Sequence, residues 1–126
     1  MKPLSPETKF FLIFILTIII TRVSLFIAGL YASDADNLGV TLFGLRLHHY
    51  MYGLVLIPLG IVFAKVFLYA LGWGLFVDEL TYLLIGGQNH ADNYSWISLA
   101  GTGILALVVF LVRKRMVRIV NINQKA

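Results

Sequence analysis

Four long apolar segments alternate with short polar segments along this chain. The apolar segments cover residues 10–31, 47–70, 71–86 and 96–112, and the stretches between them are rich in Asp, Asn, Ser and Gly. A helix that crosses a bilayer needs about 20 predominantly apolar residues. The pattern therefore predicts an all-α polytopic membrane protein, in which four transmembrane helices form a small bundle and residues 1–126 make a single integral membrane domain.

The second and third segments depart from a simple spanning helix. The second contains Pro58, which membrane helices tolerate, usually with a kink. The third is flanked by glycines, and a helix over 71–86 would rise only about 24 Å, against a hydrocarbon core of about 30 Å. We expect the third helix to be short, or to be a segment that its neighbours shield from lipid.

Composition and charge support a membrane location. Hydrophobic residues make up 60% of the chain and charged residues 13%, whereas charged residues form about a quarter of a soluble domain. There is no cysteine, which excludes disulfides and thiolate metal sites. We expect the lipid bilayer as the partner and no nucleic acid, because the net charge of +4 comes largely from basic residues that flank the apolar segments.

The basic residues also predict the orientation of the chain. Lysine and arginine collect on the cytoplasmic side of membrane helices. Lys2 and Lys9 precede the first segment, and a cluster that starts at Arg113 follows the fourth. We therefore expect a multi-pass protein of the plasma or inner membrane with both termini in the cytoplasm.

Two adjacent carboxylates, Asp78 and Glu79, interrupt the third apolar segment. An ionised side chain at the bilayer centre costs at least about 2.5–3.5 kcal/mol, so such groups nearly always have a partner. Arg22 lies at a similar depth in the first segment, about 13 Å from its outer end, and an ion pair is the expected arrangement because an unpaired buried charge is far costlier. The fourth segment adds a polar stripe with Ser98 and Thr102 at helical spacing.

A histidine pair, His48 and His49, opens the second segment within reach of Glu79. We interpret Glu79 as a metal ligand or general base, because burial disfavours the charged form of a carboxyl group, and Arg22 as the charge partner of the other acid. Glu79, Asp78 and His49 are the candidate catalytic residues. Further polar residues that would lie near this site are Tyr52, Tyr82, His90, Asp92 and Tyr94.

A metal site is one interpretation of these groups. His48, His49, Asp78 and Glu79 offer the imidazole and carboxylate ligands that suit zinc, iron or manganese. However, the Glu-x-x-His spacing of metal sites in helix bundles is absent, and adjacent histidines on a helix point about 100° apart. The competing interpretation is a structural or proton-handling cluster. Serine catalysis lacks the G-x-S-x-G motif, and haem binding would pair His48 or His49 with His90, which lies in a predicted loop.

Three short motifs resemble those of a group of small, uncharacterised bacterial and archaeal integral membrane proteins. They are Leu47-His48-His49-Tyr50-Met51-Tyr52-Gly53, Val77-Asp78-Glu79-Leu80 and Asp92-Asn93-Tyr94-Ser95-Trp96. Such proteins carry an L-H-H-x-x-x-G segment, a D-E pair and a D-x-Y-W-like segment in this order, and Ser95 is a departure from the last. The resemblance covers about residues 45–98 and implies architecture and a site only. The site residues it implies are His48, His49, Gly53, Asp78, Glu79 and Tyr94.

The sequence leaves three functions open and does not decide whether the protein is an enzyme. The first is a His/carboxylate site near the outer leaflet that binds a metal and acts on a lipid or a membrane-embedded substrate. The second is a non-enzymatic subunit that handles ions or protons, which would assemble as a homo-oligomer because one short chain is too small to form a pathway. The third is an accessory scaffold whose charges fix the register of the helices.

Overall fold

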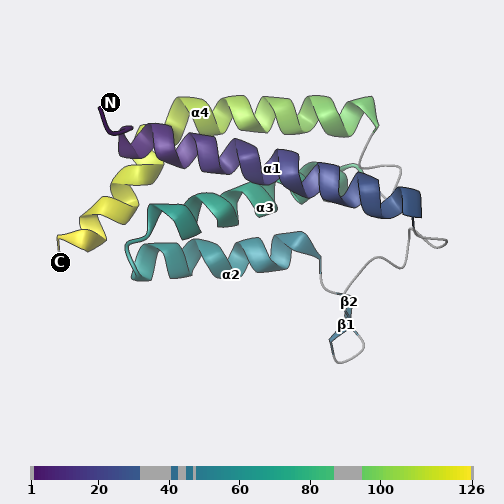
Figure 1. The fold of residues 1–126 in the computed structure, drawn as a ribbon, viewed down its shortest axis with the longest axis horizontal. Coiled ribbons are helices and arrows are strands. Elements are labelled where there is room, and N and C mark those ends of the chain that lie inside the picture. The colour runs from purple at the N-terminus through teal and green to yellow at the C-terminus, as the bar shows by residue number, and fades with distance from the viewer. Residues whose placement is uncertain (1, 32–40, 43–44, 47, 87–94, 126) are drawn as a thin grey trace.

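The computed structural model describes residues 2–31, 41–42, 45–46, 48–86 and 95–125, which form four helices and a small hairpin (Figure 1). The helices are α1 (Pro6–Tyr31), α2 (His49–Val62), α3 (Val66–Leu84) and α4 (Trp96–Gln124). The hairpin pairs β1 (Thr41–Leu42) with β2 (Leu45–Arg46), antiparallel, with Thr41 opposite Arg46. Apart from this hairpin, the elements formed by the described residues are helices, as predicted. Three helices, α1, α3 and α4, are long and apolar enough to cross a membrane, and α2 is shorter.

The helices lie roughly along one axis, and α3 contacts each of the other three (Figure 1). Both ends of the chain lie at the same end of the bundle, together with the turn between α2 and α3. The start of α2, the end of α1 and the start of α4 lie at the opposite end. We call these the terminal end and the site end of the bundle.

The predicted boundary between the second and third segments, at residues 70 and 71, is wrong. The turn lies at 63–65, so α3 has 19 residues, and α2, with 14, is the short helix rather than the third. Ala64 makes the turn with a φ of 50°, a left-handed conformation that costs a residue with a side chain about 1–2 kcal/mol. The sequence shows no glycine there to mark a turn. The helix that contains the fourth predicted span continues beyond residue 112, because α4 ends at Gln124.

Glycines allow α2 and α3 to approach closely. A Cβ atom on Gly53 would lie 2.6 Å from the backbone oxygen of Gly72, and one on Gly60 would lie 2.5 Å from the backbone nitrogen of Tyr69. Such distances leave no space for a side chain, as is typical of small residues at interfaces between membrane helices. Gly72 thus belongs to the interior of α3 and does not mark its beginning.

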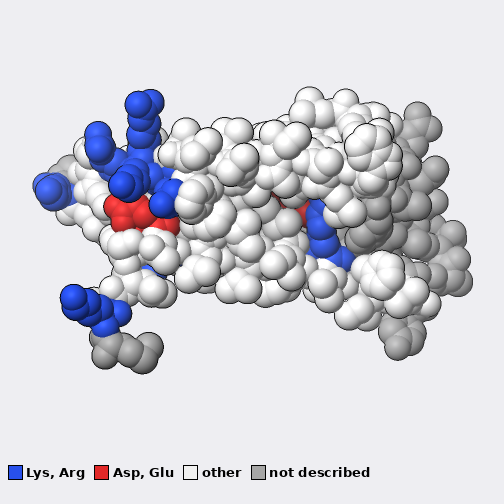
Figure 2. All heavy atoms as spheres, turned by 90° about the horizontal axis from the view of Figure 1, so that it is seen from above, with Lys and Arg blue, Asp and Glu red and all other residues white. Residues whose placement is uncertain are grey.

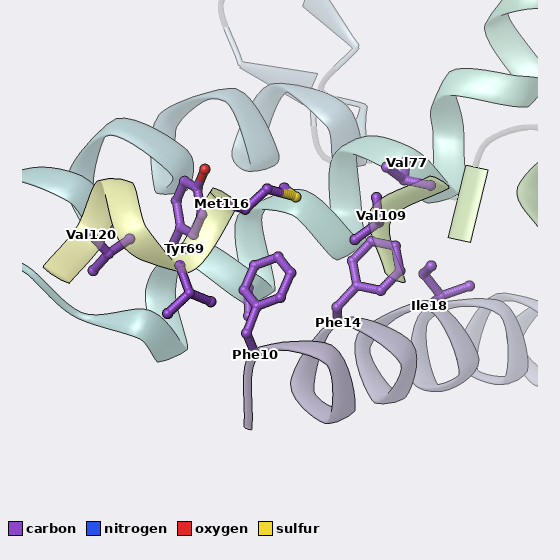
Figure 3. Close-up of a cluster of buried hydrophobic side chains, with 10 residues drawn as sticks. Phe10, Phe14, Ile18, Tyr69, Val77, Val109, Met116 and Val120 are labelled. Atoms are coloured by element: carbon purple, nitrogen blue, oxygen red, sulfur yellow. The ribbon is translucent and has the colours of Figure 1, made fainter. Parts of the chain in front are cut away.

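An apolar core fills the terminal end of the bundle. Phe10, Phe14 and Ile18 follow one face of α1 at helical spacing and point toward α3 and α4 (Figure 3). The ring centroids of Phe10 and Tyr69 are 5.7 Å apart. The members of the core cluster are Phe10, Phe14, Ile18, Tyr69, Ala70, Val77, Val109, Met116, Val117 and Val120. The buried charged groups lie outside this cluster, nearer the site end.

The close approach of α2 and α3 makes a testable prediction. Replacing Gly53 with alanine places a methyl group against the backbone of α3, and we expect a loss of about 1–3 kcal/mol of unfolding free energy. Gly103, a helical glycine in α4 with no atom within 4 Å of the added Cβ, is the matched control. Gly103→Ala should leave stability unchanged or raise it, because alanine favours a helix by about 1 kcal/mol. Unfolding in mixed micelles measures both, and equal effects of the two substitutions would contradict the close contact.

Candidate functional site

Arg22 and Asp78 form a buried ion pair that joins three helices. The Nε of Arg22 donates to Asp78 Oδ1 at 2.6 Å, and its Nη2 donates to the backbone oxygen of Asp78 at 3.2 Å. The same Nη2 donates to Thr102 Oγ1 at 2.8 Å and lies 3.5 Å from Ser98 Oγ on α4. The side chains of Arg22 and Asp78 are only 12% and 7% exposed. The predicted ion pair is confirmed, and the guanidinium connects α1 to both α3 and α4.

Glu79 faces the other way and contacts the start of α2. Its Oε1 lies 2.7 Å from His48 Nδ1, and its Oε2 accepts a hydrogen bond from the backbone N–H of Tyr50 at 3.0 Å. His48 is the N-cap of α2, and its side chain makes no capping hydrogen bond. The first backbone N–H groups of a helix lack partners within the helix and attract negative charge. Glu79 therefore caps α2 from a neighbouring helix.

The two carboxylates thus belong to separate sites on different sides of α3. Adjacent residues on a helix point about 100° apart, so Asp78 contacts Arg22 of α1, which in turn contacts α4, while Glu79 reaches α2. The structure brings Glu79 together with the histidine pair, as we expected from depth. It places His48 nearer than His49, whose Nδ1 is 4.0 Å from Glu79 Oε2.

His48 is in contact with Glu79 and is partly exposed. Its ring stacks against that of Tyr50, with centroids 5.9 Å apart, and its side chain is 35% exposed, close to the 37% of His49. An ionised carboxylate can only accept hydrogen bonds. A neutral His48 therefore donates from Nδ1 to Glu79 and carries its lone pair on Nε2. An oriented imidazole of this kind is suited to act as a general base.

The other predicted site residues have less defined positions. Tyr52 is 42% exposed on α2, and Tyr82 is half-buried on α3. His90, Asp92 and Tyr94 lie outside the described residues. Within the described part of the chain, no group of three or more His, Asp or Glu side chains could hold a metal ion, so the proposed zinc, iron or manganese site has no support from the structure.

Sequence reasoning missed two contacts of this region. The stripe of Ser98 and Thr102 was visible at helical spacing, but its role as a partner of Arg22 was not. The backbone N–H of Tyr50 has no signal in the sequence at all, because every residue except proline has this group. The absence of a Ser, Thr, Asp or Asn side chain at the N-cap position, occupied by His48, was the one available clue that another group caps α2.

Within the described residues, the fold and these contacts define a helical protein with three helices of membrane-spanning length and apolarity, two buried carboxylates, and a partly exposed His48 in contact with one of them. Comparison with models of known protein families, with curated proteins and with solved structures gives no match. The resemblance described above therefore depends on its three motifs alone.

Removing either member of the Arg22–Asp78 pair should destabilise the protein. Arg22→Leu leaves Asp78 buried without its cation, and we expect a loss of about 3–5 kcal/mol of unfolding free energy. In the double variant Arg22→Leu/Asp78→Leu no charge is left unpaired, so most of that loss should be recovered. Unfolding titrations of the unmodified protein, the two single variants and the double variant make a double-mutant cycle, which measures the interaction energy of the pair. Additive losses would contradict a direct pair.

The orientation of His48 by Glu79 can be tested by nitrogen NMR. The chain has three histidines, so His48→Gln and His49→Gln variants assign the signals. We expect His48 in its neutral form to carry hydrogen on Nδ1. In Glu79→Gln, the amide oxygen still accepts from Tyr50 N–H while the amide NH₂ donates to His48, which moves the ring hydrogen to Nε2. A tautomer that is the same in both proteins would refute this geometry, and His49 should not change.

Proposed function

We propose that this chain is a four-span integral membrane protein whose His48–Glu79 pair acts as an acid–base site. The site would lie near the outer leaflet and act on a lipid or another membrane-embedded substrate. The observation that carries the proposal is the contact of 2.7 Å between His48 Nδ1 and the nearly buried Glu79 carboxylate, on a histidine that is itself one-third exposed.

The distribution of charge supports the orientation. Lys and Arg side chains gather at the terminal end of the bundle (Figure 2). Eight of the ten basic residues belong to the segments at that end: Lys2, Lys9, Lys65, Arg113, Lys114, Arg115, Arg118 and Lys125. Because basic residues favour the cytoplasmic side, the proposed location is the plasma or inner membrane with both termini in the cytoplasm. The His48–Glu79 pair at the site end then faces outward.

The proposed chemistry uses the second ring nitrogen of His48, Nε2. His48 Nε2 would take a proton from a water molecule or a substrate hydroxyl, and the resulting imidazolium would be stabilised by the Glu79 carboxylate. The same nitrogen would return the proton to a leaving group. This role requires one ring nitrogen held and one accessible; the contact of Nδ1 with Glu79 and the 35% exposure of the His48 side chain support it.

The alternative of a non-enzymatic scaffold or ion-handling subunit also has a specific observation in its favour. Glu79 caps α2 through Tyr50 N–H, and Arg22 links α1, α3 and α4. Both contacts contribute to structure whether or not the histidine reacts. In this alternative the charged groups set helix register, and proton transfer through His48 would need no substrate.

A comparison of matched histidine variants tests the proposed function. Protein reconstituted with a total bacterial polar lipid extract should change the lipid profile seen by mass spectrometry. His48→Gln and Glu79→Gln should lower that rate by about 10²-fold or more, the usual contribution of a general base. His49→Gln removes an imidazole of nearly equal exposure and should retain most activity.

Other outcomes distinguish the alternatives. An unchanged lipid profile, with proton flux into dye-loaded vesicles that depends on His48, would replace the enzyme with a proton-handling subunit. If neither assay responds and only stability changes, the scaffold interpretation holds.

A further inference from the structure

The last part of α4, residues 113–124, extends beyond its apolar stretch; we call it the α4 tail. The tail is docked along the bundle and does not project freely from it. Met116, Val117 and Val120 are buried in the core cluster, and Val120 lies beside Tyr69 in Figure 3. The tail crosses the terminal end of the bundle toward α2 (Figure 1).

Two amide side chains join the end of the tail to the α2–α3 turn. Asn123 Nδ2 donates to the backbone oxygen of Ile61 at 2.8 Å, and Gln124 Nε2 donates to that of Ala64 at 2.9 Å. Ile61 belongs to the last turn of α2, and its oxygen also accepts from the backbone N–H of Ala64 at 3.1 Å, whereas Ala64 lies in the turn itself. The tail is therefore held at the level of this turn.

The level of the turn corresponds to the edge of the apolar zone. Val62, Phe63 and Phe67 are largely exposed around the turn, which suits contact with acyl chains, and the exposed Lys65 lies between them. A lysine at such a position reaches from apolar surroundings to the headgroup layer. The α4 tail thus lies beside the lipid headgroups in the proposed membrane.

The outward face of the tail combines cations with isoleucines. Arg115 lies three and four residues before Arg118 and Ile119, and these two lie four and three residues before Ile122, so the four share one face. Ile119 is 49% exposed and Ile122 63% exposed, and both arginines are exposed. A helix face with basic and large apolar residues side by side is typical of helices that lie at a membrane interface.

Arg113, at the start of the tail, is engaged with the protein. The guanidinium carbon of Arg113 lies 3.7 Å from the centre of the Phe110 ring. Arg115 and Arg118 are therefore the cations best placed to bind a ligand beside the exposed isoleucines.

We propose that the outward face of the α4 tail binds anionic phospholipid headgroups of the leaflet at the terminal end. Arginine matches phosphate oxygens with paired hydrogen bonds, and the isoleucines would enter the boundary between headgroups and acyl chains. Because the same segment donates hydrogen bonds to the end of α2 and to the turn, lipid binding would also stabilise the α2–α3 hairpin. This inference rests on the proposed membrane location and is independent of any reaction at His48.

A single fluorescent label tests the proposal, because the chain has no cysteine. Ile122→Cys carrying nitrobenzoxadiazole reports whether this face meets water or lipid. We compare full-length protein in vesicles of phosphatidylcholine with vesicles in which about a third of the lipid is phosphatidylglycerol. We expect blue-shifted, brighter emission only with the anionic lipid, weakened by high salt.

Charge variants assign the effect to the tail. Arg115→Gln/Arg118→Gln in the labelled protein should lower the ratio of inserted to water-exposed label by about fivefold for each charge removed. Lys2→Gln/Lys9→Gln removes the same charge from the same end but from the region of α1, and it should leave the ratio unchanged. An equal loss in both variants would show that overall charge, not this face, is responsible and would overturn the proposal.

Two further results would also overturn it. Emission that is the same in both vesicle types would mean that no anionic lipid is recognised. Emission that depends on the ratio of protein to lipid would point instead to a second copy of the chain. Protein that fails to float with vesicles on a density gradient would refute the membrane location itself, so the failure of that proposal is distinguishable from the failure of this one.

Discussion

The ion pair between Arg22 and Asp78 is the constraint on which the arrangement of the helices depends. A guanidinium and a carboxylate buried in apolar surroundings must meet, because either one alone would be far less stable. Their contact, extended to Thr102, sets α1, α3 and α4 at one mutual depth. It also sets the rotation of α3, and that rotation directs the neighbouring Glu79 toward α2. The position of the candidate acid–base pair is therefore a consequence of the structural pair beside it.

Different interactions stabilise different levels of the bundle. Aromatic and branched side chains from α1, α3 and α4 fill the terminal end, where the α4 tail also closes the α2–α3 turn. Along the contact between α2 and α3, Gly53 and Gly60 allow the backbones to touch, so the short helix is held by close approach more than by large side chains. The contacts of the buried charged side chains lie toward the site end. A reactive group placed there can move its protons without disturbing the core.

Depth along each apolar run was enough to predict the main charged contacts. Arg22, Asp78 and Glu79 were expected at one level because a helix rises uniformly, and two of the expected contacts, Arg22–Asp78 and Glu79 with the histidine pair, are present. The α2–α3 turn was misplaced for a physical reason: glycines near residue 71 suggested a boundary there, whereas Gly72 and Gly74 lie inside α3 and make close contacts with α2 and α1. The turn instead contains Ala64 in a left-handed conformation, which the sequence does not predict. Which of two adjacent histidines meets Glu79 also escaped prediction, because both begin the same helix.

The sequence alone determined the helical class, the apolar stretches and the need for buried charges to find partners. These properties follow from composition and from the local rise of a helix, and they do not depend on how helices are placed against one another. Only the tertiary structure decided that the adjacent carboxylates serve different helices, that Glu79 caps α2 through a backbone N–H, and that the end of α4 returns to α2. Those outcomes depend on the rotation and axial offset of each helix, which are set by contacts between residues far apart in the chain.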